Sequence, residues 1–273
     1  MTAVFVSGSF DNLRSRQVRF LEEAARIGRV QALLWSDAVV QAIDRKKPVF
    51  SQAERRYFLE AIRFVDGVIL VDELLSPDSL PAGLTGSPAA WVVPAGEDNQ
   101  AKLDFCRVNG IDYRVIPDSL LEQFPDHQAS ELKPASSRKK VIVTGCYDWL
   151  HTGHVRFFEE VSQLGDLYVV VGSDENVRLL KGEGHPMFGE AERQYMVQAV
   201  RYVTETLVST GSGWMDAEPE IERIKPDRYV VNEDGDQPEK QAFCQEHGLE
   251  YVVLKRLPKE GLQRRSSTDL RGF

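Results

Sequence analysis

The sequence lacks the long hydrophobic stretch that a membrane-spanning helix requires. No apolar run approaches the roughly 18 residues of a transmembrane candidate, and the N-terminus shows no charged segment followed by an apolar one, as a secretory signal peptide would. The 273 residues include only three cysteines, too few for a disulfide framework. These absences predict a cytoplasmic protein without a membrane partner.

The chain also lacks the excess of positive charge that general nucleic-acid binding requires. Its net charge is −9, with 33 Lys and Arg against 42 Asp and Glu. Basic residues nevertheless gather near the end, where the chain from Lys255 onward has six Lys or Arg and two acids. We therefore predict no nucleic-acid partner, and a local cationic segment that suits a polyphosphate.

The sequence contains a long internal repeat. Val4–Gly28 matches Val141–Gly165 at 11 of 25 positions, where chance at ordinary composition gives about one or two. With a one-residue slip, Pro48–Val65 then lies on Pro186–Val203. The pattern indicates duplication of a whole domain, and each copy is long enough to bury its own core.

The repeat sets the predicted domain boundaries. We place a degenerate domain at residues 1–133 and a second domain at residues 141–273. Residues 134–140 between them are small, polar and basic and begin with a proline, which is typical of a linker.

In the second domain, β-rich runs alternate with helical patterns. We predict strands at Val141–Gly145, Leu167–Gly172, Leu207–Ser209, Arg228–Val231 and Tyr251–Leu254, and helices at Val155–Leu164, Glu190–Val200, Glu218–Ile224 and Glu239–Glu246. Such alternation indicates parallel strands joined by right-handed crossovers. The predicted fold class is α/β, with two tandem Rossmann-like, doubly wound parallel-sheet domains. In such a sheet the ligand crevice lies beyond the carboxyl ends of the strands.

The first chemically informative motif is VIVTGCYDWLHTGH at residues 141–154, a buried strand followed by a turn and His-x-Gly-His. Gly153 allows close approach of a ligand to the backbone. His154 lies near the start of the next helix, where free N–H groups and the helix dipole favour a phosphate. His151 and His154 could donate to phosphate oxygens as charge develops on them. The alternatives are two unrelated histidines or a zinc pair, for which no further ligands occur at suitable spacing.

The second motif is RRSSTDLR at Arg264–Arg271. Hydroxyls of Ser266, Ser267 and Thr268 at a predicted helix start would bond phosphate oxygens, and Arg271 could reach the same group with a charged fork. The alternative is an ordinary N-cap before a short terminal helix.

Together the two motifs resemble the nucleotidyltransferase superfamily marked by His-x-Gly-His, over the whole second domain. The nearest likeness is to the cytidylyltransferases that activate glycerol phosphate, phosphocholine or phosphoethanolamine. The phosphoethanolamine enzymes also have two tandem domains, but there the second is degenerate. Asp174–Arg193 resembles a loop of the adenylyltransferase that acts on heptose phosphate.

The resemblance implies that a phosphomonoester oxygen attacks the α-phosphorus of CTP or ATP, with CTP favoured. Pyrophosphate leaves, and Mg²⁺ is held by the substrate phosphates rather than by the protein. The implied catalytic residues are His151, His154, Thr268 and Arg271. The implied nucleotide-binding residues are Gly145, Cys146, Tyr147, Gly153, Lys181, Ser266 and Ser267, with Lys181 as the cation of a mobile loop. Weaker acceptor-binding candidates are Arg193, Arg201 and Trp214.

The first domain serves as an internal control. It has Arg14 and Gln17 in place of the two histidines, so we predict that it is non-catalytic. Relatives commonly pair two such domains, so the first domain is expected to form a pseudo-dimer with the second within the chain; a homo-oligomer stays open. An arginine like Arg193, kept in both copies, fits a structural role as well as a phosphate-binding one. Trp214 fits either stacking on a cationic acceptor or, as a buried tryptophan, packing of the loop.

Three other functions remain open at this stage. The first is an adenylyltransferase acting on a sugar phosphate. The second is a nucleotide-binding regulator in which both copies bind and neither turns over. The third is a tRNA synthetase, against which the absence of an anticodon-binding module in the sequence counts.

Overall fold

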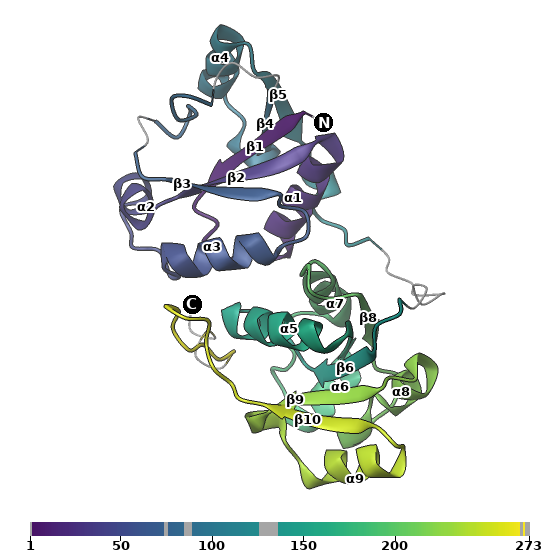
Figure 1. The fold of residues 1–273 in the computed structure, drawn as a ribbon. Helices are drawn as coiled ribbons and strands as arrows, with labels where there is room; N and C mark the ends of the chain where they lie inside the picture. Colours follow the sequence, from purple (N-terminus) through teal and green to yellow (C-terminus); the bar gives the residue numbers. More distant parts are fainter. Residues whose placement is uncertain (1, 74–75, 85–88, 126–135, 268–269, 271–273) are drawn as a thin grey trace. The chain divides into compact units, whose positions relative to one another are not determined.

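A computed structural model describes residues 2–73, 76–84, 89–125, 136–267 and 270 of the chain. The chain divides into two compact units, Met1–Phe124 and Pro125–Phe273, which we call unit 1 and unit 2. Each unit has a five-stranded parallel sheet flanked by helices (Figure 1). The predicted α/β class with two Rossmann-like parallel-sheet domains is confirmed.

Unit 1 has the strand order β3-β2-β1-β4-β5. Its strands are β1 (Ala3–Gly8), β2 (Arg29–Trp35), β3 (Gly67–Val71), β4 (Ala89–Pro94) and β5 (Asp112–Ile116). Its helices are α1 (Ser15–Ile27), α2 (Asp37–Asp44), α3 (Gln52–Ala61) and α4 (Gln100–Asn109), with short 3-10 turns η1 (Ala95–Glu97) and η2 (Asp118–Leu120).

Unit 2 has the order β10-β9-β6-β7-β8, which is the same order with β6 in the place of β1. Its strands are β6 (Lys140–Gly145), β7 (Asp166–Val171), β8 (Glu205–Val208), β9 (Arg228–Asn232) and β10 (Glu250–Leu254). Its helices are α5 (Thr152–Leu164), α6 (Asp174–Lys181), α7 (Glu190–Gln198), α8 (Glu218–Ile224) and α9 (Pro238–Glu246), with short turns η3 (Gly213–Met215) and η4 (Glu233–Gly235).

The strand register opens a crevice beside β6. This strand pairs with β7 along its whole length, from Lys140 to Gly145. It pairs with β9 only at Val141 and Ile142. The chain reverses its direction of winding between these two neighbours, so their carboxyl ends form the switch point at which doubly wound sheets bind ligands.

The core of unit 2 explains why its elements form. The strand residues Ile142, Tyr168 and Tyr229 are almost fully buried, because helices cover both faces of the sheet. On α5, Val155 and Phe158 are fully buried and share the helix face that contacts the sheet.

The predicted elements of unit 2 agree with the structure to within a few residues. The helix at Glu218–Ile224 has the predicted bounds, whereas α5 begins at Thr152, three residues before its predicted start. The segment read as a mobile loop contains α6, which the sequence analysis missed and which ends at Lys181. This helix forms because Ser173 caps it, with its hydroxyl accepting the N–H of Asn176 at 3.1 Å.

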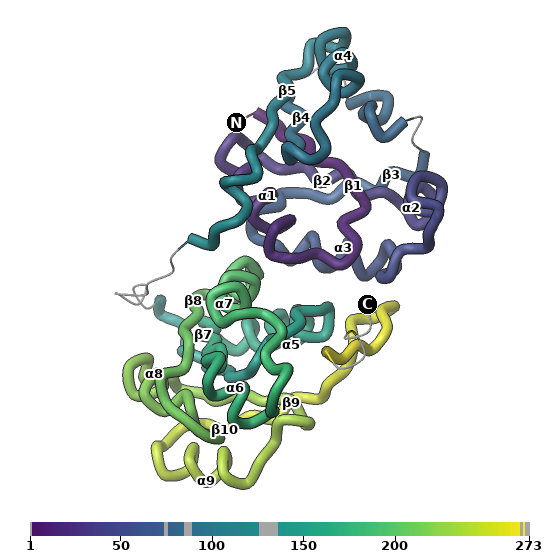
Figure 2. Tube along the Cα trace, turned by 180° about the vertical axis from the view of Figure 1, so that it is seen from behind, coloured from purple at the N-terminus to yellow at the C-terminus, as the bar shows by residue number. Residues whose placement is uncertain are grey.

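The chain after β10 returns to the start of α5. Both views of the molecule show this C-terminal segment beside α5 (Figures 1 and 2). Lys259 Nζ donates to Glu159 Oε1 at 2.7 Å, which ties the segment to the helix. Among the described residues, every helix is too short or too polar to cross a membrane.

Candidate active site

His151 is the residue that starts α5. Its Nδ1 accepts the backbone N–H of Gly153 at 3.0 Å, so the imidazole takes the place of the usual hydroxyl or carboxylate cap. The ring is 2% exposed. Because Nδ1 is the acceptor, a neutral ring carries its proton on Nε2, which is then a donor.

His154 stacks on His151 one turn into the helix. The ring centroids are 4.0 Å apart and the planes differ by 26°. The ring of Tyr147 meets His154 edge-on, with centroids 5.3 Å apart. Burial holds the pKa of His154 well below its ordinary value, and the neighbouring charges of His151, Arg256 and Lys181 lower it further. His154 is therefore neutral near pH 7 in the ligand-free protein.

We predict that His154 makes unit 2 sensitive to acid. The unfolded chain takes up a proton near the ordinary histidine pKa of about 6.5, whereas the folded chain resists it. Stability is thus complete above that pH and is lost as the pH falls toward the depressed folded pKa. We expect the free energy of unfolding to fall more steeply below about pH 6.5 in the wild type than in His154→Gln. Urea unfolding at a series of pH values measures this, and equal slopes would contradict it.

Two glycines of the site are required by side-chain packing. A Cβ on Gly153 would lie 2.8 Å from Cε1 of His151. A Cβ on Gly145 would lie 2.9 Å from Cζ of Tyr147, which itself has a positive φ of 52°. The sequence predicts Gly153 because a glycine lets a ligand approach the backbone closely. The structure adds a second reason, since a glycine also leaves room for the His151 ring.

Gly153→Ala tests that second reason. The added methyl group would force the His151 ring to shift, since 2.8 Å is shorter than carbon atoms tolerate. A displacement of about 1 Å at a catalytic group lowers rates by roughly 10²-fold. We expect such a loss in kcat with a small change in melting temperature, measured by pyrophosphate release and thermal unfolding. An unchanged kcat would show that the ring position is unimportant.

The serine segment joins the histidine loop. Ser267 Oγ donates to the carbonyl oxygen of Trp149 at 3.2 Å, a contact across 118 positions of sequence. A Cβ on Gly153 would also lie 3.5 Å from the carbonyl oxygen of Arg265. The two motifs therefore surround one space.

The sequence predicts a second helix start at residues 266–268, and most of the residues that would form its first turn lie outside the described ones. Residues 262–267, up to this point, are not helical. Tertiary contacts hold them, since Arg256 Nη2 donates to the Arg265 carbonyl at 3.1 Å and Ser267 bonds to Trp149. Thr268 and Arg271, both predicted to be catalytic, lie outside the described residues.

A pocket of about 300 Å³ opens at this place. Its lining includes the predicted residues Gly145, Cys146, Tyr147, His151, Gly153, His154, Lys181, Ser266 and Ser267. Residues that the sequence analysis did not single out also line it, among them Asp148, Asn232, Asp234, Lys240 and Arg256. The repeat could have signalled Arg256, because Asp118 stands in its place in unit 1.

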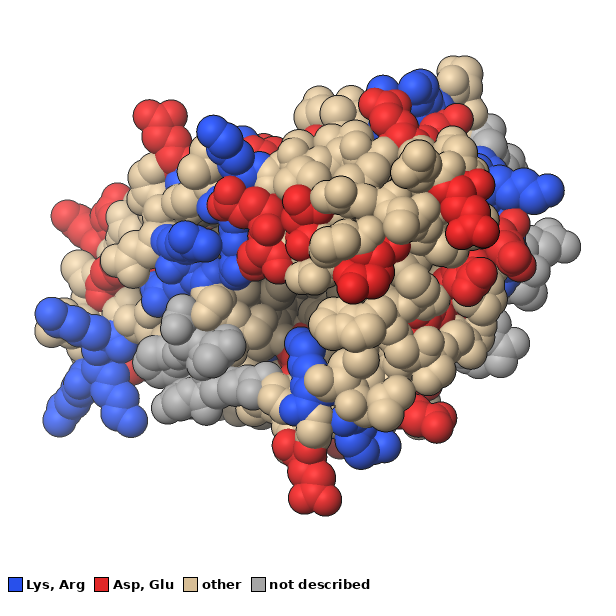
Figure 3. Space-filling model, turned by 90° about the horizontal axis from the view of Figure 1, so that it is seen from below, with Lys and Arg blue, Asp and Glu red and all other residues tan. Residues whose placement is uncertain are grey.

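The charges of the pocket suit an anion. Of the described lining residues, Lys181, Lys240 and Arg256 are cationic, and the histidine pair adds donors. The carboxylate of Asp148 already has hydrogen-bond donors, because its Oδ1 accepts the backbone N–H groups of Met187 at 2.7 Å and Phe188 at 3.1 Å. On the surface, Lys and Arg side chains gather beside a hollow (Figure 3).

Arg193 is buried below the site rather than in its lining. Its guanidinium donates to the carbonyls of Cys146 at 2.7 Å and Phe188 at 2.8 Å, and to Asp174 at 2.6 Å. It thus ties the loop after β6 to the loop before α7. Its acceptor-binding role stays a prediction, and these contacts favour the structural role.

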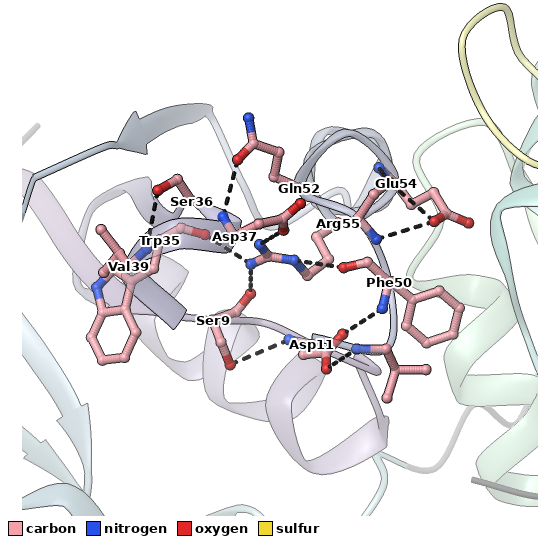
Figure 4. A network of polar contacts seen from close by, with 12 residues as sticks. Ser9, Asp11, Trp35, Ser36, Asp37, Val39, Phe50, Gln52, Glu54 and Arg55 are labelled. Atoms are coloured by element: carbon pink, nitrogen blue, oxygen red, sulfur yellow. Dashed lines mark hydrogen bonds and ion pairs between the residues drawn. The ribbon is translucent and has the colours of Figure 1, made fainter. Parts of the chain in front are cut away.

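Unit 1 has the same network around Arg55. This guanidinium donates to the carbonyls of Phe50 and Trp35 at 3.0 and 2.9 Å, to the carbonyl of Ser9, and to Asp37 at 2.7 Å (Figure 4). Unit 1 keeps this arrangement although it lacks both histidines. The arrangement therefore serves the folding of the loops.

The other two acceptor-binding candidates lie outside the described pocket lining. Arg201 is exposed just after α7. Trp214 is 66% exposed on η3, so the expected alternative of a buried, loop-packing tryptophan is wrong. The turn η3 is held to α6 by the side chain of Asn176, which accepts the N–H of Gly213 and donates to its carbonyl, and not by packing of Trp214.

Unit 1 has a cavity of about 210 Å³ at the equivalent place, lined by Gly8, Phe10, Arg16 and Gln17 among others. Arg16 occupies the position of Gly153 and pairs with Asp118 at 2.5 Å, the residue in the position of Arg256. This half-exposed ion pair stands where unit 2 has Gly153 and Arg256, and Arg256 itself pairs with Asp234.

The described residues contain no group of three His, Cys, Asp or Glu side chains placed to hold an ion. They therefore offer no metal site made of side chains alone. Cys146 lines the pocket, but burial raises the pKa of its thiol. It is therefore protonated at neutral pH and a poor nucleophile.

Comparisons with known proteins find a family match in the second half of the chain. A family model described as cytidylyltransferase-like matches residues 142–272. The chain is 39% identical over 97 residues to a FAD synthase of Ferroglobus placidus, covering 35% of this chain and 60% of that protein. It is 42% identical over 71 residues to the bifunctional protein HldE of Pelobacter propionicus, covering 26% of this chain and 14% of that protein.

A crystal structure of a lipopolysaccharide core biosynthesis protein from Thermoplasma volcanium is similar with 25% identity and a TM-score of 0.39, covering 44% of this chain and 99% of that one. The chain spans less than two thirds of the length of the two curated relatives named above. Residues 142–272, just under half of the chain, thus match the cytidylyltransferase-like family.

Proposed function

We propose that unit 2 transfers a nucleoside monophosphate, with CMP favoured, from a nucleoside triphosphate to a small phosphomonoester and releases pyrophosphate. The observation that carries the proposal is the bond from Ser267 to Trp149, which brings the serine segment against the histidine loop around one cationic pocket. A triphosphate needs such a set of donors and cations from several segments at once.

The chemistry needs positioning and charge stabilisation rather than a protein nucleophile. An acceptor phosphate oxygen forms a bond to the α-phosphorus, and the bond from that phosphorus to the bridging oxygen of pyrophosphate breaks. His151 and His154 would donate to the α- and β-phosphate oxygens as their charge rises. Lys181 and Arg256, both close enough to influence His154, would offset the charge of the leaving group and acceptor.

Mg²⁺ belongs to the proposal as an ion held by the substrate phosphates. When bound, it would neutralise part of the charge on the β- and γ-phosphates. The hydroxyl of Ser266 would then face the remaining oxygens, whereas the hydroxyl of Ser267, which already donates to the carbonyl of Trp149, would hold the segment in place.

We further propose that unit 1 is a non-catalytic partner of unit 2. Arg14, Gln17 and the Arg16–Asp118 pair replace the residues that unit 2 would use on phosphates. Expression of residues 138–273 alone tests this, and a soluble, fully active monomer would remove the reason for a partner.

One comparison favours a second candidate. The similar FAD synthase makes, by its name, an adenine dinucleotide, which supports transfer of AMP to a phosphorylated acceptor such as a sugar phosphate. The mechanism would be the same and only the base would differ. A nucleotide-binding regulator stays the non-enzymatic alternative.

The deciding experiment measures pyrophosphate release with CTP or ATP and Mg²⁺ across a panel of phosphorylated alcohols, amines, sugars and flavin mononucleotide. Release that depends on one acceptor identifies the reaction, and its base preference separates the two transferases. Nucleotide binding without release for every acceptor would favour the regulator.

A further inference from the structure

A lysine occupies the same repeat position in both units but makes different contacts in each. Lys102 on α4 and Lys240 on α9 each stand three residues before a Phe-Cys pair that the repeat aligns. In unit 1, Lys102 Nζ donates to Asp78 Oδ1 at 2.8 Å, and the lysine is 7% exposed. Its charge is therefore neutralised inside the unit.

In unit 2 this ion pair is open. Asp216 is the counterpart of Asp78, yet no carboxylate of the described residues lies within 4 Å of Lys240 Nζ as an ion pair. The hydrogen bond that Lys240 makes is a long one, 3.4 Å to the carbonyl of Gly235. Its side chain lines the pocket instead. A half-buried ammonium with so little local bonding has donors left for a ligand.

Lys240 belongs to the wall that lies apart from the phosphate-binding candidates. It comes from α9, just after β9 and η4, and shares the lining with Val230, Val231 and Asn232. The carboxylates of Asp216, Asp234 and Asp236 act on the charge of Lys240, whereas the cations Lys181 and Arg256 act on the pKa of His154. A nucleotide with its α-phosphate at His154 and its triphosphate at the serine segment would place its nucleoside along this wall.

Resting on the proposed function, we propose that Lys240 is a specificity-determining residue that donates a hydrogen bond to a carbonyl oxygen of the nucleobase. An ammonium has three donors and no acceptor. Cytosine offers O2 as a carbonyl acceptor. Adenine has no carbonyl oxygen. Its ring nitrogens accept hydrogen bonds but belong to a larger two-ring base that presents them at other places, and its exocyclic amino group is a donor. The residue therefore selects CTP against ATP.

The test uses the full chain as wild type, Lys240→Met and Lys240→Arg, with Lys102→Met as the matched control in unit 1. Calorimetry measures the dissociation constants of CTP and ATP with Mg²⁺, and of inorganic triphosphate. We expect Lys240→Met to weaken CTP by about 10- to 100-fold, the range for loss of a hydrogen bond from a charged group. ATP and triphosphate should change by less than about threefold. Lys240→Arg should keep part of the preference, and Lys102→Met all of it.

Several results would overturn the assignment. A wild type that prefers ATP, or an equal loss for CTP and ATP, would place Lys240 against the ribose or the phosphates. No loss for either nucleotide would remove it from the site. Because binding is measured without an acceptor, the absence of pyrophosphate release would reject the proposed transferase and still leave this assignment testable. Thermal unfolding of Lys240→Met checks that the variant is folded.

Discussion

Replacing His154 by alanine is expected to lower kcat for pyrophosphate release by about 10²–10³-fold, the usual loss when one donor to a developing anion is removed. The ring is stacked on His151 and buried beside Tyr147, so its position is fixed before substrate arrives. Such a donor costs no reorganisation during the reaction, which is why its loss falls on the chemical step.

The matched control for this prediction is Gln17→Ala, which changes the equivalent position in unit 1. It should leave kcat unchanged. Circular dichroism should show both variants folded, because His151 rather than His154 caps α5. A His154→Ala enzyme with kcat within about threefold of wild type would exclude a role for this imidazole in the transition state.

Replacing Arg193 by methionine is expected to destabilise unit 2 by about 3 kcal/mol, because the buried carbonyls of Cys146 and Phe188 lose their donor. The loop that carries Tyr147 and Asp148 would then lose its anchor. We therefore expect pyrophosphate release to fall together with stability. Urea unfolding and kinetics on the same preparations measure both effects.

Two further variants separate an anchoring role from contact with the acceptor. Arg193→Lys should fail to restore stability, because one ammonium cannot reach two carbonyls and Asp174 in three directions. Arg55→Met should destabilise unit 1 through the same lost bonds and leave the KM for the acceptor unchanged. A raised acceptor KM in Arg193→Met with unaltered stability would instead support contact with substrate.

The main fold was predictable because buried parallel strands read as continuous β-branched runs. Val141–Gly145 and Leu167–Gly172 fall within one residue of β6 and β7. The neighbourhood of His151 was predictable for the same reason, since it follows the end of a central strand. The helix α6 was missed because its sequence lies among glycines and charges that resemble a loop.

Other features of the site depend on contacts between distant segments, which a single sequence does not display. Ser267 and the carbonyl of Arg265 bond to segments far from them in the sequence, which the composition of the Ser-Ser-Thr run does not signal. Lys240 and Asp216 look like the pair that Lys102 and Asp78 make, and only coordinates reveal that they are apart. The repeat located both positions, but could not tell which pair was closed.

The Arg16–Asp118 pair of unit 1 has an evolutionary consequence. If the first domain descends from an active ancestor, restoring histidines at positions 14 and 17 would not by itself restore its chemistry. Arg16 and Asp118 would still stand where the second domain has a glycine and an arginine, so at least four positions would have to change.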